Sequence, residues 1–148
     1  MRKRERNEWL EAQPCVSFVS CPGLKSHKEH EIAKKQGSPG FGSVLSFGLK
    51  TNHDTHNRFV SYLKVITSAV SLGDDESLFV FLDEDDDRQS LYPEKFHNVF
   101  FRFSVGIEDV AGIIENLRQA LEKRACPPPS KPDNHTKPPN REAFYFTD

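Results

Sequence analysis

One arginine in this sequence stands among phenylalanines, where a charge is costly. Arg102 lies in the run Phe100–Asp109, and strand alternation places Phe101 and Phe103 on one face and Arg102 on the other. A partly buried guanidinium requires an anionic partner, since an unpaired buried charge costs several kcal/mol. No acidic residue of the strand shares its face. Two interpretations remain. The guanidinium forms an internal ion pair on folding, or its forked N–H groups bind the carboxylate of a ligand.

Other residues with metal or catalytic chemistry give weaker patterns. His27 and His30 are three residues apart, as are His53 and His56, which is a spacing that two metal ligands can have. No cysteine or carboxylate partner is fixed beside them, so we interpret them as surface histidines and predict no metal site. The run Asp83–Asp87 is interpreted as a solvated loop, because cation-binding loops space their ligands around a glycine turn. The sequence has no nucleophile elbow, and we predict no hydrolase triad.

The elements that must position Arg102 follow from hydrophobic periodicity. Phe59, Leu63, Ile66 and Val70 predict a long helix over 54–70, and Ser26 is expected to cap a helix over 27–36. Further helices are predicted over 3–13 and 108–123, and strands over 16–19, 44–50, 77–82 and from residue 100 onward. This order predicts an α/β fold, an α+β sandwich with a small sheet of three to four strands covered by helices. The connection between the strands at 44 and 77 is long enough for a crossover.

Length and proline content predict one domain with a tail. The 148 residues suffice for one compact domain and are too few for two ordinary ones. Six of the ten prolines follow Cys126, which predicts a disordered proline-rich tail. We therefore expect an N-terminal helix over 1–13, a domain over 14–124 and the tail over 125–148.

Charge and composition exclude several partners. A formal net charge of -2 gives no basic surface for nucleic acid or anionic lipid. No apolar run is long enough to span a bilayer, and the N-terminus lacks the apolar core of a signal peptide. The three cysteines have neither metal-like nor disulfide-framework spacing, which fits a reducing compartment. We expect a cytoplasmic protein with no membrane or nucleic-acid partner.

Several ordered motifs resemble a known family. The matching blocks are Trp9-Leu10-Glu11, Cys21-Pro22-Gly23-Leu24-Lys25-Ser26-His27, Gly40-Phe41-Gly42-Ser43-Val44-Leu45-Ser46-Phe47, Ser71-Leu72-Gly73 with Glu76-Ser77-Leu78, and Arg102-Phe103-Ser104-Val105-Gly106-Ile107-Glu108-Asp109. They resemble the C-terminal domain of the pyridoxal-phosphate-dependent enzymes of Cys/Met metabolism, such as cystathionine gamma-synthase, cystathionine gamma-lyase, methionine gamma-lyase and O-acetylhomoserine sulfhydrylase. The resemblance covers roughly residues 8–123, and five blocks in order are more specific than any single motif.

The resemblance implies substrate-binding roles for two residues. In the family, the arginine at the position of Arg102 binds the α-carboxylate of the amino-acid substrate, and the serine at the position of Ser71 helps to position substrate. Val70 is similar to the apolar residue of gamma-lyases that act on methionine. The implied cofactor is pyridoxal phosphate, and the implied reactions are β- or γ-elimination or replacement at a sulfur amino acid.

The chain also departs from the family pattern. The family's Schiff-base lysine and its cofactor-binding groups belong to a large domain whose motifs are not found here, and we interpret Lys64 as a solvated lysine. We therefore predict no catalytic and no cofactor-binding residue in this chain. The first hypothesis is that this chain is the small domain of a transsulfuration-type lyase or transferase and is inactive when isolated. Its partner would be a large domain in another chain, or the chain would form a homo-oligomer. The alternative is a non-catalytic remnant whose sheet face mediates association.

Overall fold

The computed structural model describes residues 2–37, 40–51, 53–82, 89–97 and 100–124. Five strands form one mixed sheet in the order β1–β2–β5–β4–β3. The strands are β1 (Val16–Ser20), β2 (Val44–Leu49), β3 (Thr67–Ser68), β4 (Leu78–Leu82) and β5 (Phe100–Ser104). The helices are α1 (Arg2–Glu11), α2 (His30–Gln36), α3 (His53–Ser61) and α4 (Val110–Arg124), with 3-10 turns η1 (Gln89–Leu91) and η2 (Glu94–Phe96). The predicted α/β class is confirmed, with one or two more strands than predicted.

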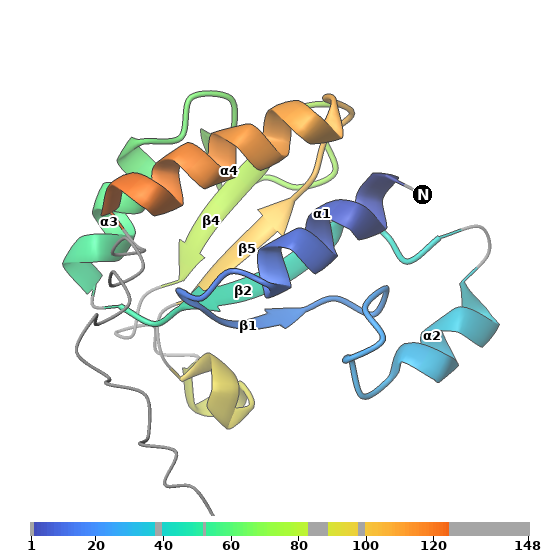
Figure 1. The fold of residues 1–148 in the computed structure, drawn as a ribbon. Coiled ribbons are helices and arrows are strands. Elements are labelled where there is room, and N and C mark those ends of the chain that lie inside the picture. The colour runs from blue at the N-terminus through green and yellow to red at the C-terminus, as the bar shows by residue number, and fades with distance from the viewer. Residues whose placement is uncertain (1, 38–39, 52, 83–88, 98–99, 125–148) are drawn as a thin grey trace, which may run out of the picture.

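The central strand β5 pairs antiparallel with β2 on one side and with β4 on the other. Strands β2 and β4 therefore run parallel to each other, and α3 lies on the connection between them, so the predicted crossover is present. β3 pairs parallel with β4, and β1 pairs antiparallel with β2. Figure 1 shows α1, α3 and α4 together over one face of this sheet, with η1 and η2 away from them. The Arg102 strand thus occupies the middle of the sheet.

The core lies between β5 and the three helices. Phe101 and Phe103 are fully buried, and their rings pack against Phe47 and Phe79 at centroid distances of 4.5 to 5.7 Å. Helix α4 contributes a stripe of buried side chains at helical spacing: Ile113, Leu117 and Leu121. Each fully buried large apolar side chain contributes about 1.5–3 kcal/mol, so this face holds the domain together.

The opposite face of β5 carries Arg102. In the strand register Arg102 lies between Ser46 of β2 and Val80 of β4. Its neighbour Phe100 is 6% exposed because Tyr92 and Phe96, near the 3-10 turns, pack on its ring at centroid distances of 5.7 and 4.9 Å. Arg102 is therefore on the face away from the main helices, as the alternation predicts.

The predicted helix over 54–70 is wrong beyond Ser61. Helix α3 ends there, Thr67 and Ser68 form the short edge strand β3, and Val70 is 81% exposed. Asn116 of α4 explains the change, because its Oδ1 accepts the backbone N–H groups of residues 64, 65 and 66 at 3.3 to 3.4 Å. These N–H groups would otherwise continue the helix. The extra strand of the sheet comes from this segment.

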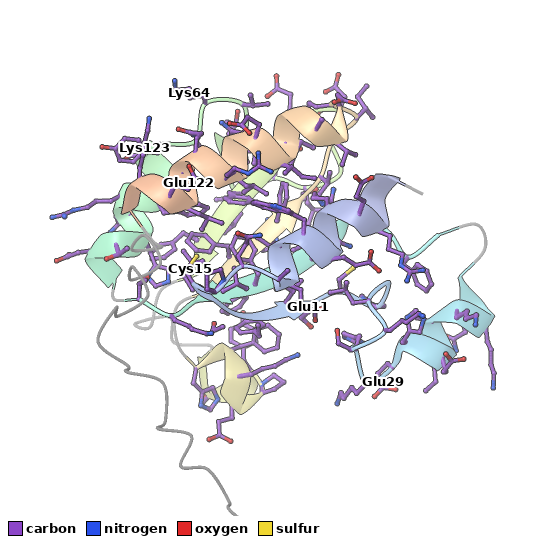
Figure 2. All side chains as sticks on the ribbon, viewed as in Figure 1. Glu11, Cys15, Glu29, Lys64, Glu122 and Lys123 are labelled. Carbon is purple, nitrogen blue, oxygen red and sulfur yellow. The ribbon has the colours of Figure 1, made fainter. Side chains whose placement is uncertain are left out.

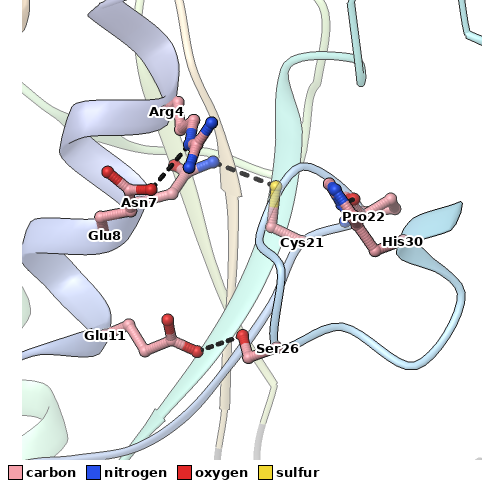
Figure 3. Close-up of polar contacts among 8 residues, drawn as sticks. All are labelled: Arg4, Asn7, Glu8, Glu11, Cys21, Pro22, Ser26 and His30. Carbon is pink, nitrogen blue, oxygen red and sulfur yellow. Dashed lines mark hydrogen bonds and ion pairs between the residues drawn. The ribbon is translucent and has the colours of Figure 1, made fainter. Parts of the chain in front are cut away.

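The predicted cap at Ser26 is also wrong. Helix α2 begins at His30 after Glu29, and no side chain caps its N-terminus. The Ser26 hydroxyl instead donates to the Glu11 carboxylate at 2.5 Å, which joins this turn to α1 (Figure 3).

Three other expectations concern the chain as a whole. The range of α1 lies within the predicted helix over 1–13, whereas the predicted tail over 125–148 lies outside the described residues, so the domain division stays a prediction.

Cys15 is disulfide-bonded, which the cysteine spacing did not predict. No helix in the described ranges is long and apolar enough to cross a membrane. The cytoplasmic location stays a prediction.

Candidate functional site

The Arg102 guanidinium is held by main-chain carbonyl groups. Its Nη2 donates to the carbonyl oxygens of Val70 at 2.6 Å and Ser71 at 3.2 Å. Its Nε is buried and has no hydrogen-bond partner. The side chain is half-buried, so the group is oriented by neutral acceptors and keeps unused donor capacity.

The internal ion pair that the sequence left open is not found among the residues that the structure describes. The ion pairs among the described residues do not include Arg102. Because carbonyl oxygens accept hydrogen bonds without neutralising the charge, the positive charge of Arg102 remains uncompensated within that part of the chain. This arrangement suits an anion that comes from outside the described residues.

Ser71 lies beside Arg102, as the motif order implied. Its contact with the guanidinium is made by its main-chain carbonyl, and its side chain is exposed. The structure therefore brings together the two predicted substrate-binding residues.

Segment 70–77 is attached to the strand and loop that follow Arg102. The Gly73 N–H donates to the Ser104 hydroxyl at 2.9 Å, and the Ile107 N–H donates to the Asp75 carbonyl at 2.9 Å. Glu108 accepts the backbone N–H of Ser77 at 2.6 Å and its hydroxyl at 2.8 Å. Every second residue from 102 to 108 thus contacts segment 70–77, since Gly106 also donates its N–H to the Ser77 hydroxyl at 3.1 Å.

These supporting contacts were not predicted from the sequence. Ser104, Gly106 and Glu108 belong to the same motif as Arg102, and their spacing of two was the signal that could have found them. Burial raises the pKa of Glu108, but the hydrogen bonds from Ser77 outweigh burial and hold that pKa below its ordinary value. Glu108 is therefore a charged anchor for the segment that holds Arg102.

The groups around Arg102 fit the binding of a carboxylate and do not fit a covalently held pyridoxal phosphate. Two carbonyl groups and a guanidinium offer no amine for a Schiff base, and Lys64 projects from the surface (Figure 2). No cluster of three potential metal ligands occurs in the described ranges. The interpretation of the histidines as surface residues is wrong for His56, which is 1% exposed. We assign no step through the cofactor to these residues.

A cavity of about 600 Å³ lies on the helix side of the sheet, apart from Arg102. Its lining comes from α1, α4 and the residue before α4: Glu5, Asp109, Val110, Ala111, Ile114, Glu115 and Arg118. Two of these residues already neutralise each other, because Arg118 pairs with Glu115 at 2.7 Å. The candidate site is therefore the Arg102 face of the sheet and not this cavity.

Comparison with known proteins agrees with the motif order. Residues 4–122 match the model of the Cys/Met metabolism PLP-dependent enzymes. The chain is 44% identical over 119 residues to a canavanine gamma-lyase of Pseudomonas canavaninivorans, covering 78% of this chain and 30% of the relative. It is 40% identical over 121 residues to the chloroplastic cystathionine gamma-synthase 1 of Arabidopsis thaliana, covering 78% of this chain and 21% of the relative.

A methionine gamma-lyase of Fusobacterium nucleatum subsp. polymorphum gives the same result, with 37% identity over 120 residues that cover 78% of this chain and 30% of that protein. The chain thus spans less than a third of the length of these relatives. The match to the family model covers most of this chain, and the chain belongs to the pyridoxal-phosphate-dependent enzymes of Cys/Met metabolism.

Proposed function

We propose that this domain binds the α-carboxylate of an amino-acid substrate through Arg102, within an enzyme of sulfur amino-acid metabolism. The observation that carries the proposal is the state of Arg102: oriented by two carbonyl groups, with a buried donor unused and without an acidic partner among the described residues. A carboxylate has two oxygens that match the guanidinium fork, and such charge-assisted bonds are about twice as strong as neutral ones.

The names of the relatives support the same part of the chemistry. They are lyases and synthases of canavanine, methionine, cystathionine and homocysteine, which are all α-amino acids with a carboxylate. Pyridoxal phosphate, when bound, draws electrons from the carbon that carries the carboxylate and so allows β- or γ-elimination or replacement. The contribution of this domain is orientation of that carboxylate by Arg102, supported by the Ser71 main chain. The proposal includes the large domain of the family, which would supply the groups that hold the cofactor.

A chimera tests the role of Arg102 directly. We would replace the matching segment of the Pseudomonas canavanine gamma-lyase by residues 4–122 and measure kcat/KM for elimination from canavanine. Arg102→Gln is expected to lower kcat/KM by a factor of about 10² to 10⁴, since it removes two hydrogen bonds to a charged group worth about 1.5–3 kcal/mol each. Arg102→Lys keeps the charge but not the fork and should fall between the two.

The control for this experiment is Arg118→Gln. Arg118 is an exposed arginine of α4 whose partner is Glu115, so its loss should leave kcat/KM within a factor of two or so. A second readout uses the substrate analogue that lacks the carboxylate. If Arg102 binds that group, Arg102→Gln reduces the discrimination between substrate and analogue; unchanged discrimination would refute the proposal.

The alternative function, a non-catalytic association module, rests on exposed apolar residues near the same face. Val70 is 81% exposed, Leu72 is 55% exposed and Ile107 is 84% exposed. Isolated apolar residues are common on protein surfaces, but three near one site fit a binding surface. The chimera and the purified chain together separate the two functions. Canavanine elimination that depends on Arg102 would contradict the remnant hypothesis, whereas a concentration-dependent dimer of the purified chain, together with a chimera that Arg102→Gln leaves unchanged, would favour it.

A further inference from the structure

Exposed apolar side chains lie together at one end of the sheet, where β2 begins and β5 ends. Val44 of β2 pairs with Ser104 of β5 in the strand register. Segment 70–77 lies on the other side of β5, because the Gly73 N–H donates to the Ser104 hydroxyl at 2.9 Å. We call the apolar residues at this end the sheet-end surface; they are Phe41, Val44, Val70, Leu72 and Ile107.

One flank of the sheet-end surface is basic. Helix α2 buries none of its residues, and Figure 1 shows it apart from the helices that cover the sheet. The His30 ring stacks on Phe41 at a centroid distance of 5.5 Å, so α2 lies beside the β2 side of the surface. The last turn of α2 carries Lys34 and Lys35, which are exposed and take no part in the ion pairs of the described ranges.

The opposite flank is acidic. Asp74, Asp75 and Glu76 are consecutive and exposed. The Ile107 N–H donates to the Asp75 carbonyl at 2.9 Å, which fixes this acidic stretch beside the apolar residues. The ion pairs found in the part of the chain that the structure describes do not include these acids. Neighbouring strands are about 4.8 Å apart, so β5 and β4 keep the acidic flank about 10 Å or more from the β2 side.

We propose that the sheet-end surface binds a second copy of this chain in a dimer with twofold symmetry. In such a dimer the same patch of each copy meets itself in reverse, so the basic flank of one copy faces the acidic flank of the other. The charges that have no ion-pair partner within the described part of one chain then become paired between the two copies. The contact goes beyond the proposed binding of a carboxylate by Arg102 and does not rest on it.

The two flanks also select the second copy over other partners. Nucleic acid or an acidic peptide would match Lys34 and Lys35 but would be repelled by Asp75 and Glu76, and a basic partner would meet the reverse problem. An apolar centre rimmed by charged residues is typical of a protein interaction surface. Only a partner with both charges in the opposite order matches the whole surface, and a second copy turned by the twofold axis has that order.

The size of the sheet-end surface sets the expected strength of the dimer. A standard interface uses about 20–30 residues on each side, which is more than this surface and its two flanks provide. We therefore expect weak association, with a Kd of about 10–100 µM at low salt. Because exposed charges are screened by ions, the Kd should rise with salt concentration.

Charge reversal on each flank tests the arrangement in the full chain. One variant combines Lys34→Glu with Lys35→Glu, and the other combines Asp75→Lys with Glu76→Lys. Each variant has two flanks of the same sign, so its copies repel each other at both flanks, and sedimentation equilibrium should show a Kd at least about tenfold higher than that of the unchanged chain. Circular dichroism checks that both variants are folded.

A mixture of the two variants provides the decisive measurement. The first variant has two acidic flanks and the second has two basic flanks, so one copy of each should form a dimer about as tight as that of the unchanged chain. The control combines Lys64→Glu with Lys123→Glu, which changes the net charge as much as the first variant does. Figure 2 shows both lysines near the far end of α4 from the sheet-end surface, and their reversal should leave the Kd within a factor of about three.

Four results would overturn the proposal. The full chain could remain monomeric at about 1 mM, well above the expected Kd. The two flank variants could associate as tightly as the unchanged chain, or their equimolar mixture could stay monomeric. Growth beyond two copies would show that the contact does not close on itself.

Discussion

Replacing Gly106 by alanine should displace the segment that orients Arg102. A Cβ atom at Gly106 would lie 2.1 Å from the carbonyl oxygen of Asp75 and 2.6 Å from Oε2 of Glu108. The Glu108 side chain can rotate away only by releasing Ser77, and the Asp75 carbonyl can move only by losing its hydrogen bond from the Ile107 N–H at 2.9 Å. Both responses loosen segment 70–77 at the residues that fix it.

The expected cost follows from these contacts. Overpacking costs typically about 1–3 kcal/mol, and a lost backbone hydrogen bond adds about 1 kcal/mol. We therefore expect Gly106→Ala to lower the free energy of unfolding by about 2–4 kcal/mol. Gly112 of α4 provides the matched control, because a Cβ there meets no atom within 4 Å. Gly112→Ala should raise stability by about 1 kcal/mol, the difference in helix propensity between the two residues.

Urea unfolding of the wild-type chain and the two variants checks this prediction. The transition midpoints should shift in opposite directions with little change in the dependence on urea, since both variants expose similar surface on unfolding. A Gly106→Ala protein within about 0.5 kcal/mol of wild type would refute the reasoning, because it would mean that the close approach of Asp75 is not required for the fold.

Three further predictions use other contacts. Glu108→Gln should remove a pH dependence of the free energy of unfolding. The pKa of Glu108 is lowered in the folded state, so the stability that it contributes is complete above the ordinary glutamate pKa of about 4.3 and is lost as the pH falls through the lower folded value. In urea unfolding from neutral to acidic pH, the difference in stability between wild type and Glu108→Gln should narrow over that window. Asn116→Ala should cost about 1–3 kcal/mol in the same assay, because three backbone N–H groups lose their acceptor. Ser26→Ala should change stability by less than about 0.5 kcal/mol and leave the helical circular dichroism unchanged, since its hydroxyl contacts exposed Glu11 and caps no helix; a loss of helical signal would restore the capping interpretation.

The sequence predicted best those elements whose burial pattern is local and continuous. Helix α4 has its apolar side chains on one stripe, and the structure buries Ile113, Leu117 and Leu121 as that stripe requires. The alternation in β5 also placed Phe103 in the core and Arg102 on the other face, and Phe103 is fully buried whereas Arg102 is half-buried. In these cases the period of the pattern determines which face is buried, and no distant contact is needed.

The error at α3 has a distant cause. Phe59 and Ile66 of the predicted apolar face are buried, whereas Val70 is 81% exposed. The chain nevertheless leaves the helix after Ser61, because Asn116, about fifty residues further on, accepts the N–H groups of residues 64–66. Local periodicity contains no information about that acceptor. The buried Arg6 was missed for a similar reason, since no sequence rule predicts a full burial of a charge in a helix rich in arginine.

The way in which Arg102 is held bears on why an arginine that we propose to bind a ligand should lack an acidic partner among the described residues. A carboxylate of the protein at 4 Å would orient the guanidinium, but at an effective dielectric constant of about 20 it would also attract it by about 4 kcal/mol. A ligand carboxylate would have to displace or share that partner, and much of its binding energy would be lost. The carbonyl oxygens of Val70 and Ser71 provide orientation without a net charge. The positive charge therefore stays available for an external anion, and the contacts of Ser104, Gly106 and Glu108 with segment 70–77 keep those carbonyl groups in place.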